Sequence, residues 1–243
     1  MDCEKVANHI QEWMRKQVDS ARVSGVIVGI SGGIDSAVVA ALCKREFDDK
    51  ITGVIVPCES LADDAIDAQI LAKTFAIDCK VSNITDAYVA MLNCFPETFD
   101  CKLARSNLKS RLRMSTLYYY ANNMNCVVMG TTNRTEASIG YFTKYGDGGV
   151  DFEPIADLLK REVRELANYL GVPERIIIKP PSAGLWEGQT DEDEIGLTYD
   201  MMDNILIGKR EQPNSFYQLR KKCLHKGEVP PMCSMEDCEG FQE

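Results

Sequence analysis

The sequence of 243 residues predicts an α/β fold, a doubly wound parallel sheet flanked by helices. Two observations predict it. Short apolar segments rich in Val and Ile alternate with longer segments of helical periodicity, and buried parallel strands have this composition. The first apolar segment also leads through a turn of small residues directly into a helical run, as in a βα unit.

The expected strands lie at four short apolar segments, residues 26–30, 51–56, 78–81 and 126–129. Apolar residues at helical spacing predict the helices that surround them, at residues 4–18, 37–47, 62–75, 103–122, 157–170 and 191–206. The stretch 179–193 is rich in Pro, Gly and Ser and is expected to be a long loop, which is often functional. We expect residues 1–243 to form a single domain whose tail, from about 228 to 243, is flexible.

The charge of the chain argues against two classes of partner. Asp and Glu number 37 against 27 Lys and Arg, a net charge of −10, whereas proteins that bind long nucleic acids usually have a basic surface. No apolar run approaches the roughly 18–20 residues of a membrane helix. The first residues also lack the features of a signal peptide. We therefore expect a cytoplasmic protein without nucleic-acid or membrane partners.

The 10 cysteines are scattered and form no Cys-x-x-Cys pair. Cys43 and Cys126 lie in apolar runs and are expected to be core residues. The pattern favours free thiols over a disulfide framework. A metal site at Cys233 and Cys238 is not expected, because further ligands are not apparent.

The turn after the first strand is the strongest local signal, and it comprises Gly29, Ile30, Ser31, Gly32, Gly33, Ile34, Asp35 and Ser36. A strand, a small-residue turn and a helix direct backbone N–H groups and a helix N-terminus at an anion, most simply phosphate. The turn lacks the Lys-Ser/Thr ending of a Walker A loop and the G-x-G-x-x-G spacing of a dinucleotide fingerprint. Taken alone, it is also compatible with an ordinary Gly-rich βα turn.

The Ser-Gly-Gly-x-Asp-Ser core of this turn resembles the pyrophosphate-binding loop of ATP pyrophosphatases, which split ATP between its α and β phosphates. Further motifs follow in a fixed order, at residues 130–136, 140–151, 154–155, 159–160, 181–186 and 188–192. Together they closely resemble the ammonia-dependent NAD synthetases over nearly the whole chain. The resemblance implies a Rossmann-like fold of the adenine nucleotide alpha hydrolase type.

The resemblance also implies a reaction and its participants. ATP would activate the carboxylate of deamido-NAD as an adenylate, and ammonia would displace AMP to give NAD. By position, Thr131, Lys160 and Ser182 match residues that contact ATP, together with the turn 29–36. Asp35 and Glu136 match the Mg²⁺ ligands, and Asp35 and Lys160 would act in catalysis by positioning and electrostatics. The residues that match the deamido-NAD site are Arg111, Lys144, Asp151, His225 and Lys226.

Local alternatives exist for several of these residues. Asp35 suits a helix N-terminus, and Glu136, Lys160 and Arg111 taken singly suit a solvated surface. A lone histidine such as His225 is more often structural than catalytic. Gly227 stands where the family commonly has a basic residue, which leaves the hold on the dinucleotide at this end open.

The resemblance further implies a homodimer and an external source of ammonia. Glutamine-using relatives carry an amidase domain before the synthetase part, whereas only 24 residues precede the apolar run that begins at Gly25. The helix at 103–122, with tyrosines at 118–120, is a candidate dimer interface, although it suits the core of one subunit equally well.

Two other functions remain open at this point. The cysteines are compatible with an ATP pyrophosphatase that thiolates tRNA, although the acidic charge argues against it. The second alternative is a regulatory module that binds ATP without turnover. The presence of both proposed Mg²⁺ ligands, Asp35 and Glu136, argues against it.

Overall fold

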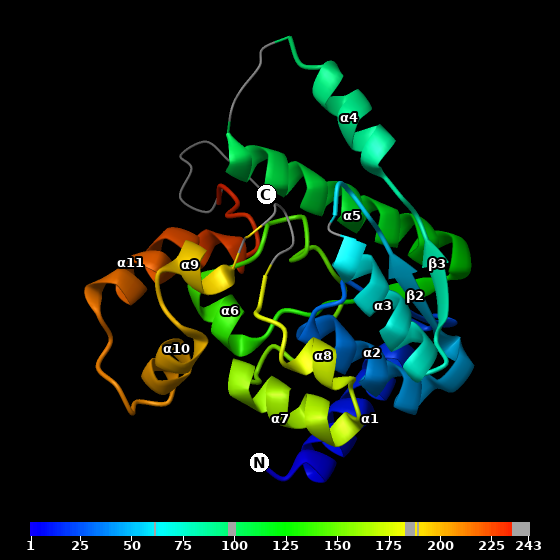
Figure 1. Ribbon diagram of the computed structural model, residues 1–243, viewed down its shortest axis with the longest axis horizontal. Coiled ribbons are helices and arrows are strands. Elements are labelled where there is room, and N and C mark those ends of the chain that lie inside the picture. Colours follow the sequence, from blue (N-terminus) through cyan, green and yellow to red (C-terminus); the bar gives the residue numbers. More distant parts are fainter. Residues whose placement is uncertain (61, 97–100, 183–187, 189, 235–243) are drawn as a thin grey trace.

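The computed structural model describes residues 1–60, 62–96, 101–182, 188 and 190–234. Much of the loop expected at 179–193, and residues 235–243 of the tail, therefore lie outside the described residues. The expected α/β fold is confirmed, with helices on both faces of a parallel sheet (Figure 1).

The sheet has four strands in the order β3-β2-β1-β4, and all neighbours run parallel. The strands are β1 (Gly25–Gly29), β2 (Ile51–Ile55), β3 (Asp78–Val81) and β4 (Cys126–Met129). The chain builds outward from β1 to β3 and then returns to the other side of β1. The direction of winding thus reverses between β1 and β4. Ligands in such sheets bind at this reversal, beyond the carboxyl ends of the strands.

Each side of the sheet is covered by helices because successive strand residues point to opposite faces. Val26 and Val28 of β1 belong to the larger core cluster, with α1 (Cys3–Ala21), α2 (Ile34–Phe47) and α7 (Lys160–Leu170). Ile27, between the two valines, faces α5 (Lys102–Met124) with Val54 and Val128. Figure 1 shows α5 on one side of the sheet and these three helices on the other. Both faces of the central strand are therefore buried, as its composition predicts.

A smaller apolar cluster gathers the last helices beside the main core. It joins α6 (Arg134–Ile139), α10 (Tyr199–Leu206) and α11 (Asn214–Cys223) through Ile139, Tyr199, Met202, Ile205 and Phe216. The remaining elements are α3 (Ala62–Thr74), α4 (Thr85–Asn93), α8 (Glu174–Ile177), α9 (Asp191–Ile195) and the short 3₁₀ turns η1 (Asp48–Lys50) and η2 (Leu224–Lys226). None of the helices in the described part of the chain is long and apolar enough to cross a membrane.

The sequence predictions differ from the structure at several places. The continuous helix predicted at 191–206 is wrong, because Gly196 ends α9 with a φ of 75° and Thr198 caps a new helix, α10. The helix predicted from 157 begins at Lys160, since Leu159 is extended and its N–H is capped by Glu162. Four helices of the described chain, α4, α6, α8 and α11, were not predicted. Cys43 is buried as expected, whereas Cys126 is only half-buried.

Candidate active site

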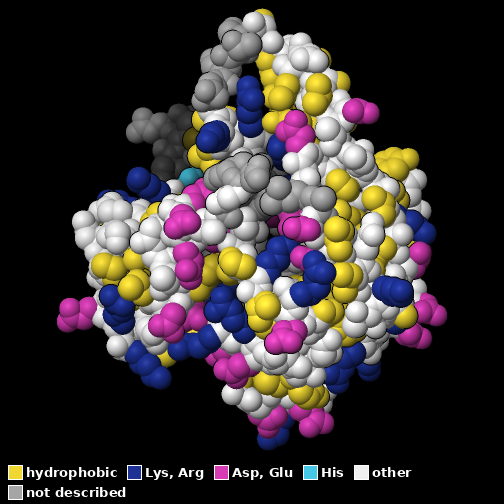
Figure 2. All heavy atoms as spheres, viewed as in Figure 1, with side chains coloured by type: hydrophobic (Ala, Val, Ile, Leu, Met, Phe, Trp, Pro, Cys, Tyr) yellow, Lys and Arg dark blue, Asp and Glu magenta, His cyan; other side chains and the backbone are white. Residues whose placement is uncertain are grey.

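A cavity of about 530 Å³ opens at the carboxyl ends of the strands, where the winding of the sheet reverses. Its walls come from the turn after β1, the end of β2, the first half of α5, the turn after β4 and the residues 140–150 and 179–182. In Figure 2, dark-blue and magenta side chains surround the hollow in the middle of this face. The cavity is therefore bordered by charges of both signs.

The turn 29–36 forms the floor of this cavity, and all of its residues except Gly32 line it. Gly32 has a φ of 83°, and a Cβ there would lie 2.4 Å from the backbone oxygen of Asp64. Only glycine fits this position without a shift of α3. Ser31 and Ser36 hydroxyls lie 3.0 Å apart, and Gly33 N–H donates to Ser31 Oγ at 3.2 Å. The turn thus has a defined shape that opens the N-terminus of α2 toward the cavity.

Three of the predicted residues meet directly above this turn and form what we call the buried centre: Asp35, Glu136 and Lys160. The Lys160 ammonium donates to Asp35 Oδ2 at 2.6 Å and to Glu136 Oε1 at 2.9 Å. Lys160 is only 1 % exposed, so the solvated-surface alternative for it is wrong. The three side chains come from α2, α6 and α7 and lie far apart in the sequence.

Asn133 fixes the geometry of the two carboxylates. Its side-chain amide donates to Asp35 Oδ1 at 2.8 Å, and its side-chain oxygen accepts the backbone N–H of Glu136 at 3.0 Å. It is also the N-cap of α6, in a capping box with Glu136. The Asn-x-x-Glu spacing was readable as a helix start, but its contact with Asp35 was not.

Burial raises the pKa of Glu136 to about 7, and the nearby negative charges of Asp35 and Asp191 act in the same direction. Burial disfavours the charged form of Lys160 as well, but the two carboxylates outweigh it and raise the Lys160 pKa. Tyr199 extends the network, since its hydroxyl lies 3.0 Å from Glu136 Oε1 and 2.8 Å from Asp191 Oδ2. Asp191 and Tyr199 were missed by the sequence analysis, because nothing in their spacing relates them to residue 136.

The oxygen donors of the buried centre fit a hard divalent cation. Asp35 and Glu136 pair with the single ammonium of Lys160, and Asp191 lies near enough to feel its charge, so acids outnumber the cation. Within the described ranges, no group of three or more His, Cys, Asp or Glu side chains is arranged to hold a metal ion. Two carboxylates suit Mg²⁺ because this ion usually keeps waters and takes further oxygens from phosphates.

A second set of predicted residues gathers around residues 140–144, and we call Arg111, Lys144 and Lys226 the cation group. Arg111 donates twice to Lys144 O at 3.4 Å, and the Lys144 ammonium donates to His225 O. Lys226 donates to the backbone oxygens of Gly140 and Phe142, both at 2.8 Å. Among the described residues, no carboxylate forms an ion pair with these three cations.

The other predicted site residues are less uniform in position. Thr131 and Ser182 line the cavity, as does Lys226, whereas Arg111, Lys144, Asp151 and His225 are not among its lining residues. Asp151 accepts the backbone N–H of Val128 at 2.7 Å and the hydroxyl of Tyr118 at 3.1 Å. In this structure its carboxylate therefore supports the strand β4. Its role toward a substrate stays a prediction.

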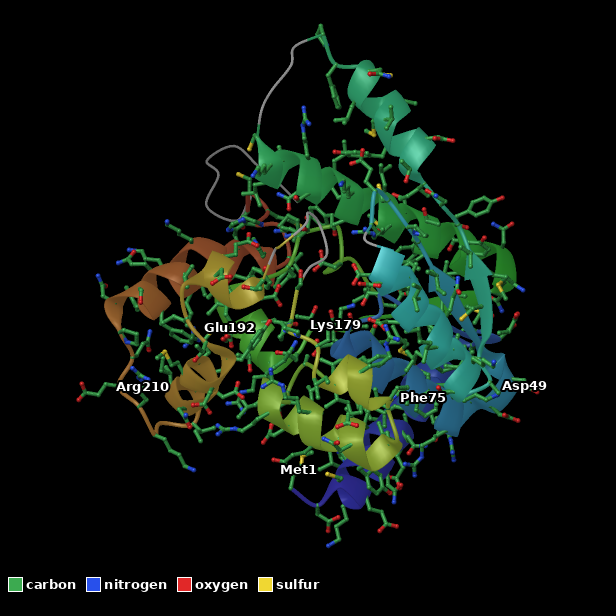
Figure 3. The ribbon with its side chains drawn as sticks, in the orientation of Figure 1. Met1, Asp49, Phe75, Lys179, Glu192 and Arg210 are labelled. Carbon is green, nitrogen blue, oxygen red and sulfur yellow. The ribbon has the colours of Figure 1, made fainter. Side chains whose placement is uncertain are left out.

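Lys179, labelled in Figure 3, also lines the cavity. Its ammonium lies 2.7 Å from both Asp64 Oδ1 and Asp67 Oδ2, so the chain after α8 is tied to α3. Because the backbone of Asp64 also abuts Gly32, these ion pairs support the turn 29–36 from behind.

A parallel sheet, a Gly-rich turn between β1 and α2 and a buried lysine beside two carboxylates together define a nucleotide-binding enzyme of the ATP pyrophosphatase type. The family model described as NAD synthase matches residues 6–236, and the chain belongs to this family. Its relatives are ligases that form a C–N bond.

The relatives agree with this assignment along the whole chain. An NH(3)-dependent NAD(+) synthetase from Syntrophomonas wolfei is 45% identical over 96% of this chain and 96% of its own length. Among solved structures, an NMN synthetase from Francisella tularensis superposes with a TM-score of 0.92 at 36% identity, covering 96% of this chain and 99% of its own. An NH3-dependent NAD synthetase from Campylobacter jejuni gives 0.79 at 31% identity, covering 96% of this chain and 100% of its own.

Proposed function

We propose that this chain amidates the nicotinate carboxylate of deamido-NAD with ammonia, using ATP and releasing AMP and pyrophosphate. One observation carries the proposal: the phosphate-binding turn and the buried centre share a cavity whose lining also includes Lys226 of the cation group. The cavity therefore offers two places for anionic ligands, which matches a reaction between ATP and a phosphorylated acceptor. The names of the relatives support the same reaction. These names do not favour the two alternatives, tRNA thiolation and a regulatory module that binds ATP without turnover.

The chemistry explains why such a site suffices. A carboxylate is a poor electrophile and its oxygen is a poor leaving group, so it must first attack the α-phosphorus of ATP to form an acyl adenylate. Ammonia then attacks the acyl carbon, and AMP departs with the former carboxylate oxygen. Both steps need positioning and neutralisation of charge rather than a covalent enzyme intermediate. The backbone N–H groups of the turn would bind the phosphates, and the fixed charge of Lys160 would stabilise the α-phosphate of the adenylyl group as it is transferred and pyrophosphate departs.

Mg²⁺ belongs to the proposal, with Asp35 and Glu136 as its protein ligands. When bound, the ion would neutralise charge on the phosphate oxygens and on the departing pyrophosphate. Because Lys160 already lies between the two carboxylates, we expect Mg²⁺ to bind together with ATP rather than to the protein alone. Titration calorimetry with MgCl₂ alone and then with MgATP distinguishes the two orders of binding.

The cation group is proposed to hold the acceptor. Among the described residues, its three positive charges have backbone oxygens and two aromatic rings as partners but no carboxylate, so an anionic ligand would compensate them. Arg binds phosphate oxygens through a planar fork, which suits the pyrophosphate of a dinucleotide. His225 would take part through its backbone, whose oxygen receives the Lys144 ammonium.

A second candidate function is the amidation of nicotinate mononucleotide to NMN. The observation that favours it is the superposition on the Francisella NMN synthetase, which is better than that on the Campylobacter NAD synthetase. The two functions differ only in the adenylyl half of the acceptor. A comparison of kcat/KM for deamido-NAD and for nicotinate mononucleotide separates them, and we expect the dinucleotide to be preferred.

The proposal also includes a cytoplasmic homodimer. Leu103 and Tyr119 of α5 are 61 % and 67 % exposed, which is unusual for large apolar side chains. Tyr118 and Tyr120 instead bond to Asp151 and Ser82 within the chain. Sedimentation of the wild type and of Tyr119→Glu tests this: a dimer that becomes a monomer in the variant supports the interface on α5, and a monomeric wild type contradicts it.

The activity itself is tested with purified protein, MgATP and ammonium chloride. We expect NAD and AMP to form in equal amounts and only when deamido-NAD is present. AMP formation without an acceptor, or without NAD, would contradict the proposal. Omission of ammonium is the control for hydrolysis of the adenylate.

A further inference from the structure

Arg113 is a cavity-lining cation that neither the phosphate-binding turn nor the cation group accounts for. It lies on α5 and reaches across to the carboxyl end of β2. Its Nε–H donates to Val56 O at 3.2 Å and its Nη2 donates to Ser60 Oγ at 3.0 Å. Both partners are neutral. Burial of the guanidinium lowers the pKa of Arg113, although Asp147 and Asp64 oppose this from a distance.

The guanidinium of Arg113 has no carboxylate partner among the described residues, because none of their ion pairs includes it. An arginine cannot shed its proton to escape burial, and a buried charge costs free energy unless it is paired. Two other lining cations avoid this cost, since Lys160 and Lys179 each lie between two acids. Arg113 thus carries into the cavity a positive charge that no described carboxylate pairs directly, although Asp147 and Asp64 act on it from a distance.

The guanidinium also retains donors for a ligand. It has five N–H groups, of which the two contacts above use two. In the described chain, the side-chain atoms that are fully hidden and lack a partner are Gln11 Oε1, Asp67 Oδ1 and Arg161 Nη2. No nitrogen of Arg113 is among them. Since Arg113 lines the cavity, its remaining N–H groups can donate to a ligand in the cavity.

The neighbouring Arg111 does not share this position. Two residues along a helix are separated by about 200°, so the two side chains leave α5 in nearly opposite directions. Arg111 is exposed and contacts Lys144 O, whereas Arg113 contacts the end of β2. The basic run on α5 therefore serves two places, and only Arg113 faces the end of the sheet where ATP and acceptor must meet.

We propose that Arg113 is a further substrate-binding residue, which donates N–H groups to an anionic oxygen of the bound substrates at the end of β2. That oxygen belongs either to a phosphate of ATP or to the acceptor carboxylate. The inference rests on the proposed function, because that function supplies the two anionic ligands.

The test compares Arg113→Lys and Arg113→Met with Arg105→Met, a control at an exposed arginine on the same helix. Lysine keeps the charge but loses the planar fork. We expect both Arg113 variants to lower kcat/KM at least about 10-fold, and the control to match the wild type. A raised KM for ATP alone assigns the oxygen to a phosphate, and a raised KM for deamido-NAD alone assigns it to the carboxylate.

Unchanged KM values for both substrates, with a lowered melting temperature, would overturn the proposal and make Arg113 a brace for the segment after β2. If Arg113→Met fails to fold, Arg113→Lys and Ser60→Ala provide the comparison of KM values in its place. Ser60→Ala removes one partner of the guanidinium without changing its charge, so we expect affinities within about threefold of wild type. Calorimetry with MgATP and with deamido-NAD gives the same answer without turnover. A wild type that makes no NAD but binds both ligands would contradict only the proposed function.

Discussion

The buried centre and the cation group balance their charges in opposite ways. In the centre, Lys160 lies between Asp35 and Glu136 and is hidden from solvent. In the cation group, Arg111, Lys144 and Lys226 donate to backbone oxygens, form no ion pair with a described carboxylate and are partly or fully exposed. In the centre, the positive charge is thus paired with carboxylates of the protein itself. In the cation group, no described carboxylate pairs with the positive charges, and we propose that an anionic ligand does so. The comparison teaches that changes in the centre should affect folding and chemistry, and changes in the cation group should affect binding alone.

Lys160→Met should have the largest effect. It leaves two carboxylates buried without a cation, and loss of one partner of a buried pair costs about 3–5 kcal/mol. We also expect turnover to fall by at least about 10²- to 10³-fold, because a fixed charge beside the reacting phosphate is lost. Denaturant unfolding and AMP release measure the two effects. Lys16→Met on the exposed face of α1 is the control, and a stable, active Lys160→Met would break the comparison.

Asp35→Asn should reduce turnover by about 10²-fold while changing the free energy of unfolding by less than about 1.5 kcal/mol. Asparagine retains an oxygen for Lys160 but loses the negative charge proposed to bind Mg²⁺. The dependence of the rate on Mg²⁺ concentration should shift to higher concentrations. Asp19→Asn, at an exposed position of α1, serves as the control. An unchanged Mg²⁺ dependence would remove Asp35 from the metal site.

Glu136 should make stability depend on pH. Burial raises its pKa from an ordinary value near 4.5 to about 7. Below pH 4.5 the group is neutral in both the folded and the unfolded chain, and its contribution is fully present. As the pH rises to 7 and beyond, only the unfolded chain ionises freely, so the contribution is lost. Glu136→Gln should therefore gain about 3 kcal/mol relative to wild type across this window.

Unfolding at a series of pH values measures this difference. Glu12→Gln, an exposed acid of α1 whose substitution leaves the centre intact, is the control and should show no such slope. A difference between Glu136→Gln and wild type that stays constant from pH 4.5 to pH 8 would show that Glu136 is ionised throughout.

Lys144→Met should have the smallest effect, an increase of about 10-fold in the KM for deamido-NAD. The KM for ATP and the free energy of unfolding should hardly change, because surface substitutions usually alter stability by no more than about 0.5 kcal/mol. Initial rates at varied concentrations of each substrate provide the measurement. An effect on the KM for ATP instead would assign the cation group to the wrong substrate.

The sheet was predictable because three of its strands, β1, β2 and β4, are largely buried and read as short apolar runs, whereas the edge strand β3 is mostly exposed. All four strands begin and end within one residue of their predicted bounds. Helix α4 escaped prediction because Tyr88 is its only buried residue, so it carries little amphipathic pattern. The break at Gly196 was missed because an acidic pattern on both sides suggested one helix, although glycine is a common helix end.

The buried centre was predictable only in part. The family resemblance named Asp35, Glu136 and Lys160, but their contacts depend on the packing of α2, α6 and α7 against one another. Asn133 and Tyr199 complete the hydrogen bonds of the centre, and no periodicity relates residues 35, 133 and 199. Arg113 lies two residues after Arg111 in the sequence. Their different contacts depend on the direction in which each side chain leaves α5, which the sequence alone does not show.

The central claim is that the turn and the buried centre transfer the AMP moiety of ATP to a carboxylate. It is tested most directly with deamido-NAD that carries ¹⁸O in its nicotinate carboxylate. Attack of that oxygen on the α-phosphorus, followed by ammonia attack on carbon, predicts AMP that contains one ¹⁸O atom, read by mass spectrometry. AMP without the label, or formation of ADP in place of AMP, would contradict the account.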